Sequence, residues 1–340
     1  MIRAVPGLSN ITVNPGVVGT NFGLAFITLL ILIMTAVIFN ETLEENEPRL
    51  KAMAASVAAP FAAAGAATGG LLGWFKRLPP WAQTAIPVLA ALALSAWLYG
   101  LENPGTGFNN ATLVLFLSYF VAFTLITYAW DGVQAMVCRH YGAPAAVRVF
   151  PIGTVVAVFA VILTRATGFQ PGLMYGFVAA NAIIQPAKLT EDQEGKKAMW
   201  SSFALLAICA AAWLLVGPLR TVSEDHSSFW AALPEGIAVG VFVAGLEGLF
   251  FQMIPIEFLD GRKLFDWNKP IWLAISLVSG FFFFEAIIND DQQAVSAVGQ
   301  TRTIITFVVV LCCLAATIGF WLFMRALGPE EGHAGPETAD

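Results

Sequence analysis

Two short stretches of this sequence place ionisable and amide side chains beside long apolar runs. The first, "YAWDGVQAMVCRHYGA", begins at Tyr128 and carries Asp131 and Gln134, and the second, "FQMIPIEFLDGRKL", carries Asp260. Asp131 and Gln134 are three positions apart, so they share one face of a helix. Polar groups at membrane depth mark functional sites or tie helices together by hydrogen bonds. The residues therefore indicate a structural tie, a ligand or protein-recognition pocket, or a metal site.

The first stretch resembles the zinc-binding helix of the site-2 protease superfamily of intramembrane metalloproteases. The residues "WDGVQAMVCRHYG" align without a gap on the family pattern H-E-x-G-H-x-x-x-A-R-R-Y-G. Trp130 stands at the first histidine, Asp131 at the glutamate and Gln134 at the second histidine. Further along, "VRVFPIG" resembles the F-P-x-G turn of the family. The flank that follows the motif is also kept, at Arg139, Tyr141 and Gly142.

The second stretch resembles the N-x-x-P-x-x-x-x-D-G-G segment, which supplies the third zinc ligand in the same family. Pro255, Asp260 and Gly261 are kept. Gln252 replaces the asparagine, and Arg262 replaces the second glycine. The resemblance implies that this segment faces the first one on the cytoplasmic side of the membrane. The chain is identified as a degenerate member of the superfamily.

The zinc ligands of that family are mostly missing from this sequence. An H-E-x-x-H helix binds zinc through two imidazoles on one face, and its glutamate polarises the metal-bound water. An indole offers only an N–H donor, so Trp130 cannot bind zinc, and Gln134 is a poor ligand beside imidazole or thiolate. Of the three ligand positions Asp260 alone keeps a ligand, whereas a catalytic site needs three. The resemblance over residues 111–270 therefore predicts a pseudoprotease, not an enzyme, without a metal or other cofactor.

The predicted function is binding rather than cleavage. The resemblance implies a groove that binds substrates in the family and that here would bind a transmembrane helix or a cytoplasmic component of a partner protein. The chain would then act as a scaffold, anchor or regulator of that partner. A homo-oligomer is a further predicted assembly. The binding function predicts a packed core around Trp130. The alternative is a small-solute or ion transporter or channel with buried carboxylates. It predicts a solvated cavity near mid-membrane that reaches Glu247 or Asp131.

The composition is that of an all-α polytopic membrane protein embedded in lipid. Of 340 residues 58% are hydrophobic and only 12% charged, whereas soluble domains carry about 25% charged residues. No basic stripe supports nucleic-acid binding. Since about 20 apolar residues make a membrane-spanning helix, the sequence predicts about nine transmembrane segments, at about 21–40, 82–100, 111–138, 149–165, 170–187, 198–218, 236–256, 270–288 and 302–326. The pair 149–165 and 170–187 is short and broken by "GFQPG", which predicts either a tight hairpin or a partly re-entrant element.

Lysine and arginine gather in alternate loops, which the positive-inside rule places in the cytoplasm. This puts the N-terminus outside and the C-terminus in the cytoplasm of a plasma membrane, and the composition favours a bacterial one. Arg165 and Arg220 are isolated exceptions. The predicted organisation is an external segment (1–20), a first span (21–40), a cytoplasmic insert with an interfacial helix (41–80), a protease-like membrane core (81–270), C-terminal spans (271–327) and a disordered cytoplasmic tail (328–340).

Other polar residues near the ends of spans are candidates for a partner-binding surface. They are His140, Arg148, Glu247, Gln252 and Glu257. Glu247 borders a stripe of small residues that recur every fourth position and favour close helix packing. The stripe consists of Gly236, Gly240, Ala244 and Gly248.

Overall fold

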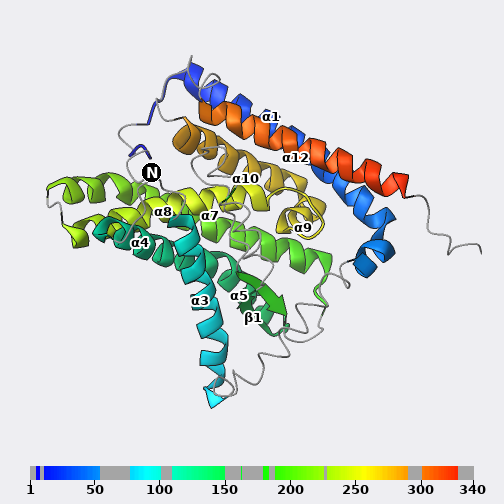
Figure 1. Cartoon of the computed structure of the whole chain (residues 1–340), viewed down its shortest axis with the longest axis horizontal. Coiled ribbons are helices and arrows are strands. Elements are labelled where there is room, and N and C mark those ends of the chain that lie inside the picture. Colours follow the sequence, from blue (N-terminus) through cyan, green and yellow to red (C-terminus); the bar gives the residue numbers. More distant parts are fainter. Residues whose placement is uncertain are drawn as a thin grey trace, which may run out of the picture.

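The chain folds into a bundle of long apolar helices (Figure 1). The computed structural model describes residues 5–7, 11–53, 77–100, 109–149, 162, 179–183, 188–225, 228–289 and 301–327. Among these residues, seven helical stretches are long and apolar enough to cross a membrane: Pro15–Glu45, Pro80–Gly100, Asn110–His140, Glu191–Asp225, Phe229–Gln252, Lys269–Ile288 and Thr301–Ala326. The mainly helical, multi-pass architecture is thereby confirmed. The count of nine spans and the orientation stay predictions.

The elements follow one another in a simple order along the chain. The first half contains α1 (Pro15–Glu45), α3 (Pro80–Gly100), α4 (Asn110–Thr127), the π-helical segment η3 (Tyr128–Gly132) and α5 (Val133–His140). Strands β1 (Ala145–Val149) and β2 (Ala179–Ile183) come next. The second half contains α7 (Glu191–Asp225), α8 (Phe229–Gln252), α9 (Asp260–Trp267), α10 (Lys269–Phe282), the π-helical segment η4 (Phe283–Ile288) and α12 (Thr301–Ala326).

A two-stranded antiparallel sheet is the main departure from the predicted all-helical fold. Ala145 of β1 pairs with Ile183 of β2, and Val149 pairs with Ala179. The prediction that the apolar segments 149–165 and 170–187 are helical is therefore wrong at Val149 and at residues 179–183. Five of the ten strand residues are alanine, which is depleted in strands, so propensity alone does not explain the sheet. The strand pairing satisfies the peptide groups that a helix would otherwise have satisfied. The rest of these two expected spans, apart from residue 162, lies outside the described residues.

Helix α8 packs between α4 and α7, and small residues permit the close approach on both sides. A Cβ atom on Gly240 would lie 3.0 Å from Ala122 of α4, and one on Gly245 would lie 2.6 Å from the Cys209 sulfur of α7. The predicted small-residue stripe is thus in contact at Gly240. Gly248 has open space instead, because the tight contact with α7 falls at Gly245.

Helices α1 and α12 lie side by side and run in the same direction along one flank of the bundle, while α3 projects from the opposite side (Figure 1). Helix α1 is longer than the predicted first span at both ends, beginning at Pro15 and ending at Glu45. Its N-cap is Asn14, whose side chain accepts a hydrogen bond from the Gly16 amide. Much of the predicted 41–80 insert, at residues 54–76, and the predicted tail lie outside the described residues.

Candidate functional site

The first motif lies where a π-helical turn interrupts a long helix between α4 and α5. Segment η3 follows α4 directly and contains Trp130 and Asp131, both of which are buried. Single π-helical turns inside α-helices are rare and frequently occur at functional sites. Trp130 belongs to the main hydrophobic core, so the indole at the position of the family's first histidine is a packed core residue.

The flank that resembles the family closes helix α5 and starts strand β1. Gly142 has a φ of 76°, which glycine adopts at little cost. Its amide donates to the Arg139 carbonyl, and the Ala143 amide donates to the Cys138 carbonyl at 2.9 Å. This pattern is a Schellman-type helix end. The Arg139 guanidinium then donates to the Ala145 carbonyl at 2.9 Å, so the flank fixes where the sheet begins.

Hydrogen bonds from two neighbouring helices position the turn between α8 and α9. This turn belongs to the second motif segment. Asn40 of α1 is buried and contacts this turn twice. Its Nδ2 donates to the Pro255 carbonyl at 2.9 Å, and its Oδ1 accepts from the Glu257 amide at 3.0 Å. On the other side of the turn, the Trp272 indole donates to the Met253 carbonyl at 2.7 Å. These contacts hold the turn from two helices.

The two motif segments meet at a hydrogen bond between Gln134 of α5 and Asp260 of α9. Gln134 Nε2 donates to Asp260 Oδ2 at 2.5 Å and lies 3.5 Å from the Ser201 hydroxyl of α7. Gln134 is 3% exposed and Ser201 fully buried. Asp131 is buried one turn before Gln134 on the same helix. The resemblance to the family implied that these segments face each other, and the structure brings them together.

Lys263 supplies positive charge beside Asp260. Its Nζ lies 3.7 Å from Asp260 Oδ1 and 3.1 Å from Glu194 Oε2 of α7. Burial alone would lower the pKa of the Lys263 ammonium, but the carboxylates of Asp260 and Glu194 outweigh burial, so its pKa is raised. The ammonium is therefore charged at neutral pH, and it links the site to the first turn of α7.

Helix α9 docks on α7 through a tryptophan and a glycine that the sequence did not single out. The Trp267 indole donates to Asp192 Oδ1 at 3.0 Å. A Cβ atom on Gly195 would lie 2.2 Å from the Trp267 ring, so only glycine leaves room for that ring. Because α9 carries both Asp260 and Lys263, this docking fixes the position of the site's charges.

The remaining predicted site residues do not join the Gln134–Asp260 contact. His140 is exposed at the end of α5 and packs edge-on against Tyr141. Glu247 is buried within α8, and Gln252 is half-buried at the end of that helix. Glu257 is exposed in the turn before α9. Arg148 lies in β1, where it pairs with Ala180.

The donor set around this contact does not fit a catalytic zinc ion. Such an ion needs three protein ligands, and Asp260 alone offers one among the matched positions. Gln134 already directs its amide nitrogen at Asp260. In the part of the chain that the structure describes, no group of three or more histidine, cysteine, aspartate or glutamate side chains could hold a metal ion. No catalytic step through zinc follows from these residues.

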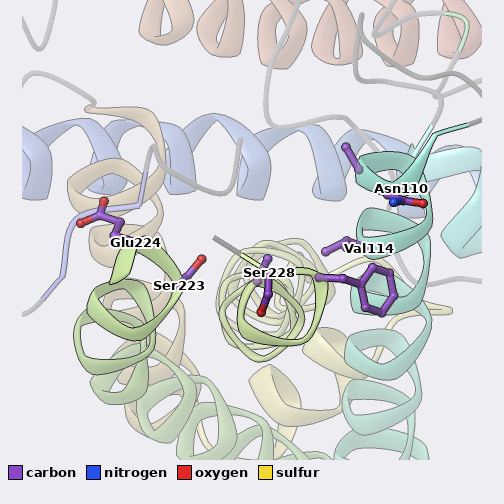
Figure 2. A pocket seen from close by; sticks show the side chains of 8 residues that line it. Asn110, Val114, Ser223, Glu224 and Ser228 are labelled. Atoms are coloured by element: carbon purple, nitrogen blue, oxygen red, sulfur yellow. The ribbon is translucent and has the colours of Figure 1, made fainter. Parts of the chain in front are cut away.

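A pocket of about 560 Å³ lies at the ends of α4, α7 and α8, away from the motif residues. Figure 2 shows Asn110 and Val114 of α4 on one side and Ser223 and Glu224 of α7 on the other, with Ser228 between them. Its lining contains neither Glu247 nor Asp131. The cavity that a transport function predicts at those two residues is therefore not this pocket.

Comparison with known proteins gives one relevant similarity. The chain is 24% identical over 170 residues to a protein of Methanocaldococcus jannaschii named "Putative zinc metalloprotease". The aligned region covers 50% of this chain and 80% of that protein. The similarity is consistent with a protease-like core of the site-2 type. No family model matches the chain, and no solved structure matches it.

This relative contradicts the prediction that the chain is not an enzyme, because its name points toward one. The prediction came from Trp130, Asp131 and Gln134 at the H-E-x-x-H positions. The missing imidazoles exclude zinc binding by this motif, whereas carboxylates such as the buried Asp131 and the half-buried Asp260 can serve acid–base chemistry without zinc. Excluding one mechanism was not a sufficient ground for excluding enzymatic activity.

The strength of the Gln134–Asp260 contact can be measured with a double-mutant cycle of Gln134→Leu and Asp260→Leu. A hydrogen bond to a charged group contributes about 1.5–3 kcal/mol, and we expect a coupling energy of this size in the free energy of unfolding. The measurement is denaturant unfolding of the four proteins in detergent. Single-variant effects that add to within about 0.5 kcal/mol would show that the two side chains are energetically independent.

Proposed function

We propose that the chain is a membrane protein with a site-2-protease-like core that binds a segment of a partner membrane protein beside the Gln134–Asp260 contact. The observation that carries the proposal is the contact itself. It joins, at 2.5 Å, two segments whose contacting residues are 126 positions apart, and these are the segments whose patterns resemble the family. The relative in Methanocaldococcus jannaschii, similar over half of this chain, supports the same core.

Each of the two segments carries a large exposed apolar side chain two positions along the chain from the contact. Met136 of α5 is 68% exposed, and Phe258, two residues before Asp260, is 65% exposed. Asn40 fixes the turn that contains Phe258 through two hydrogen bonds. Rigid apolar anchors beside a polar group are typical of surfaces that recognise a partner.

Cross-linking in native membranes tests the proposal. A photoreactive amino acid would replace Met136 or Phe258, and Leu311 of α12, which is 50% exposed, would be the lipid-facing control. We expect the same distinct cross-linked membrane protein from the first two positions and not from Leu311. Identical products from all three positions would contradict a partner site at the contact.

Peptide-bond hydrolysis at the same contact is the second candidate, favoured by the name of the relative. The captured partner would be compared in wild-type membranes and in membranes carrying Asp260→Asn, each with and without a zinc chelator. A shortened partner that disappears with Asp260→Asn would support hydrolysis, and sensitivity to the chelator would add a metal to the site. A partner of full length in all four samples would support binding alone.

A further inference from the structure

The N-terminal residues Val5–Gly7 lie on α7 near the end opposite to the Gln134–Asp260 contact. The Trp213 indole of α7 donates to the Pro6 carbonyl at 2.9 Å. Arg220 Nη2 donates to the Val5 carbonyl at 3.0 Å. Val5 is 3% exposed and belongs to the main hydrophobic core. Two side chains of one helix thus bind two consecutive carbonyl groups of the segment.

Both donors are held in place by neighbouring helices. Arg220 Nε donates to Glu235 Oε1 of α8 at 2.9 Å, in an ion pair whose side chains are mostly buried. The Trp213 ring stacks on Phe242 of α8, with centroids 5.8 Å apart, and lies edge-on to Phe282 of α10. Because these contacts are made with other helices and not with the segment, we expect the face that the donors form to be preorganised for an extended peptide.

The recognition is directed mainly at backbone rather than at side chains. Trp213, Gly217 and Arg220 are spaced at i, i+4 and i+7, so they follow one face of α7. A Cβ atom on Gly7 would lie 3.5 Å from the Gly217 Cα, at ordinary van der Waals distance, so the backbone of the segment lies against α7 at Gly217. This face would accept an extended chain with a buried apolar residue followed by a proline and a small residue.

We propose that the α7 face formed by Trp213, Gly217 and Arg220 is a peptide-binding site, occupied by the chain's own residues Val5–Gly7 and open to a similar segment of a partner polypeptide when they leave. The site is distinct from the Gln134–Asp260 contact and does not depend on its function. A tethered segment competes at a high effective concentration, so a free peptide binds weakly until the resident segment is displaced.

The test displaces the resident segment in the full-length chain. Val5→Asp would place a carboxylate in the core, which is strongly unfavourable, and Val13→Asp is the matched control because Val13 is 85% exposed. The probe is a fluorescent peptide with the sequence of residues 1–12, and its binding is followed by polarisation in detergent. We expect Val5→Asp to bind it at least about tenfold more tightly than the wild type or Val13→Asp, as removal of a tethered competitor requires.

A second substitution ties the binding to the proposed face. Adding Trp213→Phe to Val5→Asp keeps an aromatic ring at this position and removes the N–H donor, and it should return the affinity to the wild-type level. Equal binding by Val5→Asp and Val13→Asp, or equal binding of a scrambled peptide, would overturn the proposal.

A further measurement keeps the test decisive if Val5→Asp does not fold. A photoreactive residue in place of Gly217, whose Cβ position is open, should cross-link to the N-terminal segment in the otherwise natural chain. Excess free peptide should then lower the yield of that cross-link. An undiminished yield at every peptide concentration would show that the segment is a fixed part of the fold.

Discussion

Gly261→Ala is expected to destabilise the protein strongly, because the added methyl group would clash with backbone atoms. A Cβ atom at this position would lie 2.5 Å from the carbonyl carbon and oxygen of Met253 and 2.6 Å from the Gln252 oxygen. These are backbone atoms, and the Met253 carbonyl is held from the other side by the Trp272 indole. Helix α9 must therefore move, at a cost of about 3 kcal/mol by analogy with overpacked cores.

The measurement is the unfolding transition in detergent, with Gly248→Ala as the matched control. Gly248 lies in α8 with open space at its Cβ position, so alanine there should be neutral or stabilise the helix by up to about 1 kcal/mol. Gly261→Ala should also weaken the coupling between Gln134 and Asp260, since α9 carries Asp260. Unfolding of both glycine variants at the same denaturant concentration would show that α9 adjusts freely.

The meeting of the two motif segments could be predicted from the sequence, because local rules and the family pattern point the same way. The spacing of Asp131 and Gln134 sets a helix face, and the basic loops place Asp260 on the same side of the membrane. The role of Lys263 could not be predicted in this way. A lysine in a loop is ordinarily interpreted as a topology signal, and its position three residues after Asp260 matters only once α9 is helical.

The isolated Arg220 illustrates a second limit of sequence reasoning. It was an exception to the charge rule for orientation. The structure pairs it with Glu235 of α8 and with the Val5 carbonyl. Its ion-pair partner is 15 positions away along the chain and its carbonyl partner 215. Pairings at these separations depend on how the helices pack, which hydrophobic periodicity does not specify.

The β1–β2 pairing was missed for a related reason. A short apolar run is equally compatible with a buried strand and with part of a membrane helix. The choice here depends on a partner strand at residues 179–183 and on the helix end at Gly142. The positive φ of Gly142 is a local feature, and a glycine after a predicted helix is the available signal for it.

Asn40→Leu is the second substitution from which we expect a large effect. Asn40 links helix α1, which lies outside the region of family resemblance, to the turn that carries the second motif. The asparagine side chain satisfies the Pro255 carbonyl and the Glu257 amide at once. Leucine has a similar volume but no polar atoms, so both backbone groups would lose their partners. An unsatisfied buried group costs about 1–3 kcal/mol, so the two together should cost about 2–6 kcal/mol.

Asn46→Leu provides the control for this experiment, since it makes the same change near the same end of α1. Among the described residues, the Asn46 side chain hydrogen-bonds only locally, from its Nδ2 to the Thr42 carbonyl. Losing this bond should lower the free energy of unfolding by no more than about 0.5 kcal/mol. The decisive readout is the Gln134–Asp260 coupling energy measured in each background. We expect Asn40→Leu to reduce it strongly and Asn46→Leu to preserve it, because only Asn40 fixes the turn that leads into α9. A coupling energy unchanged by Asn40→Leu would mean that the docking of Trp267 on Gly195 positions Asp260 without help from α1.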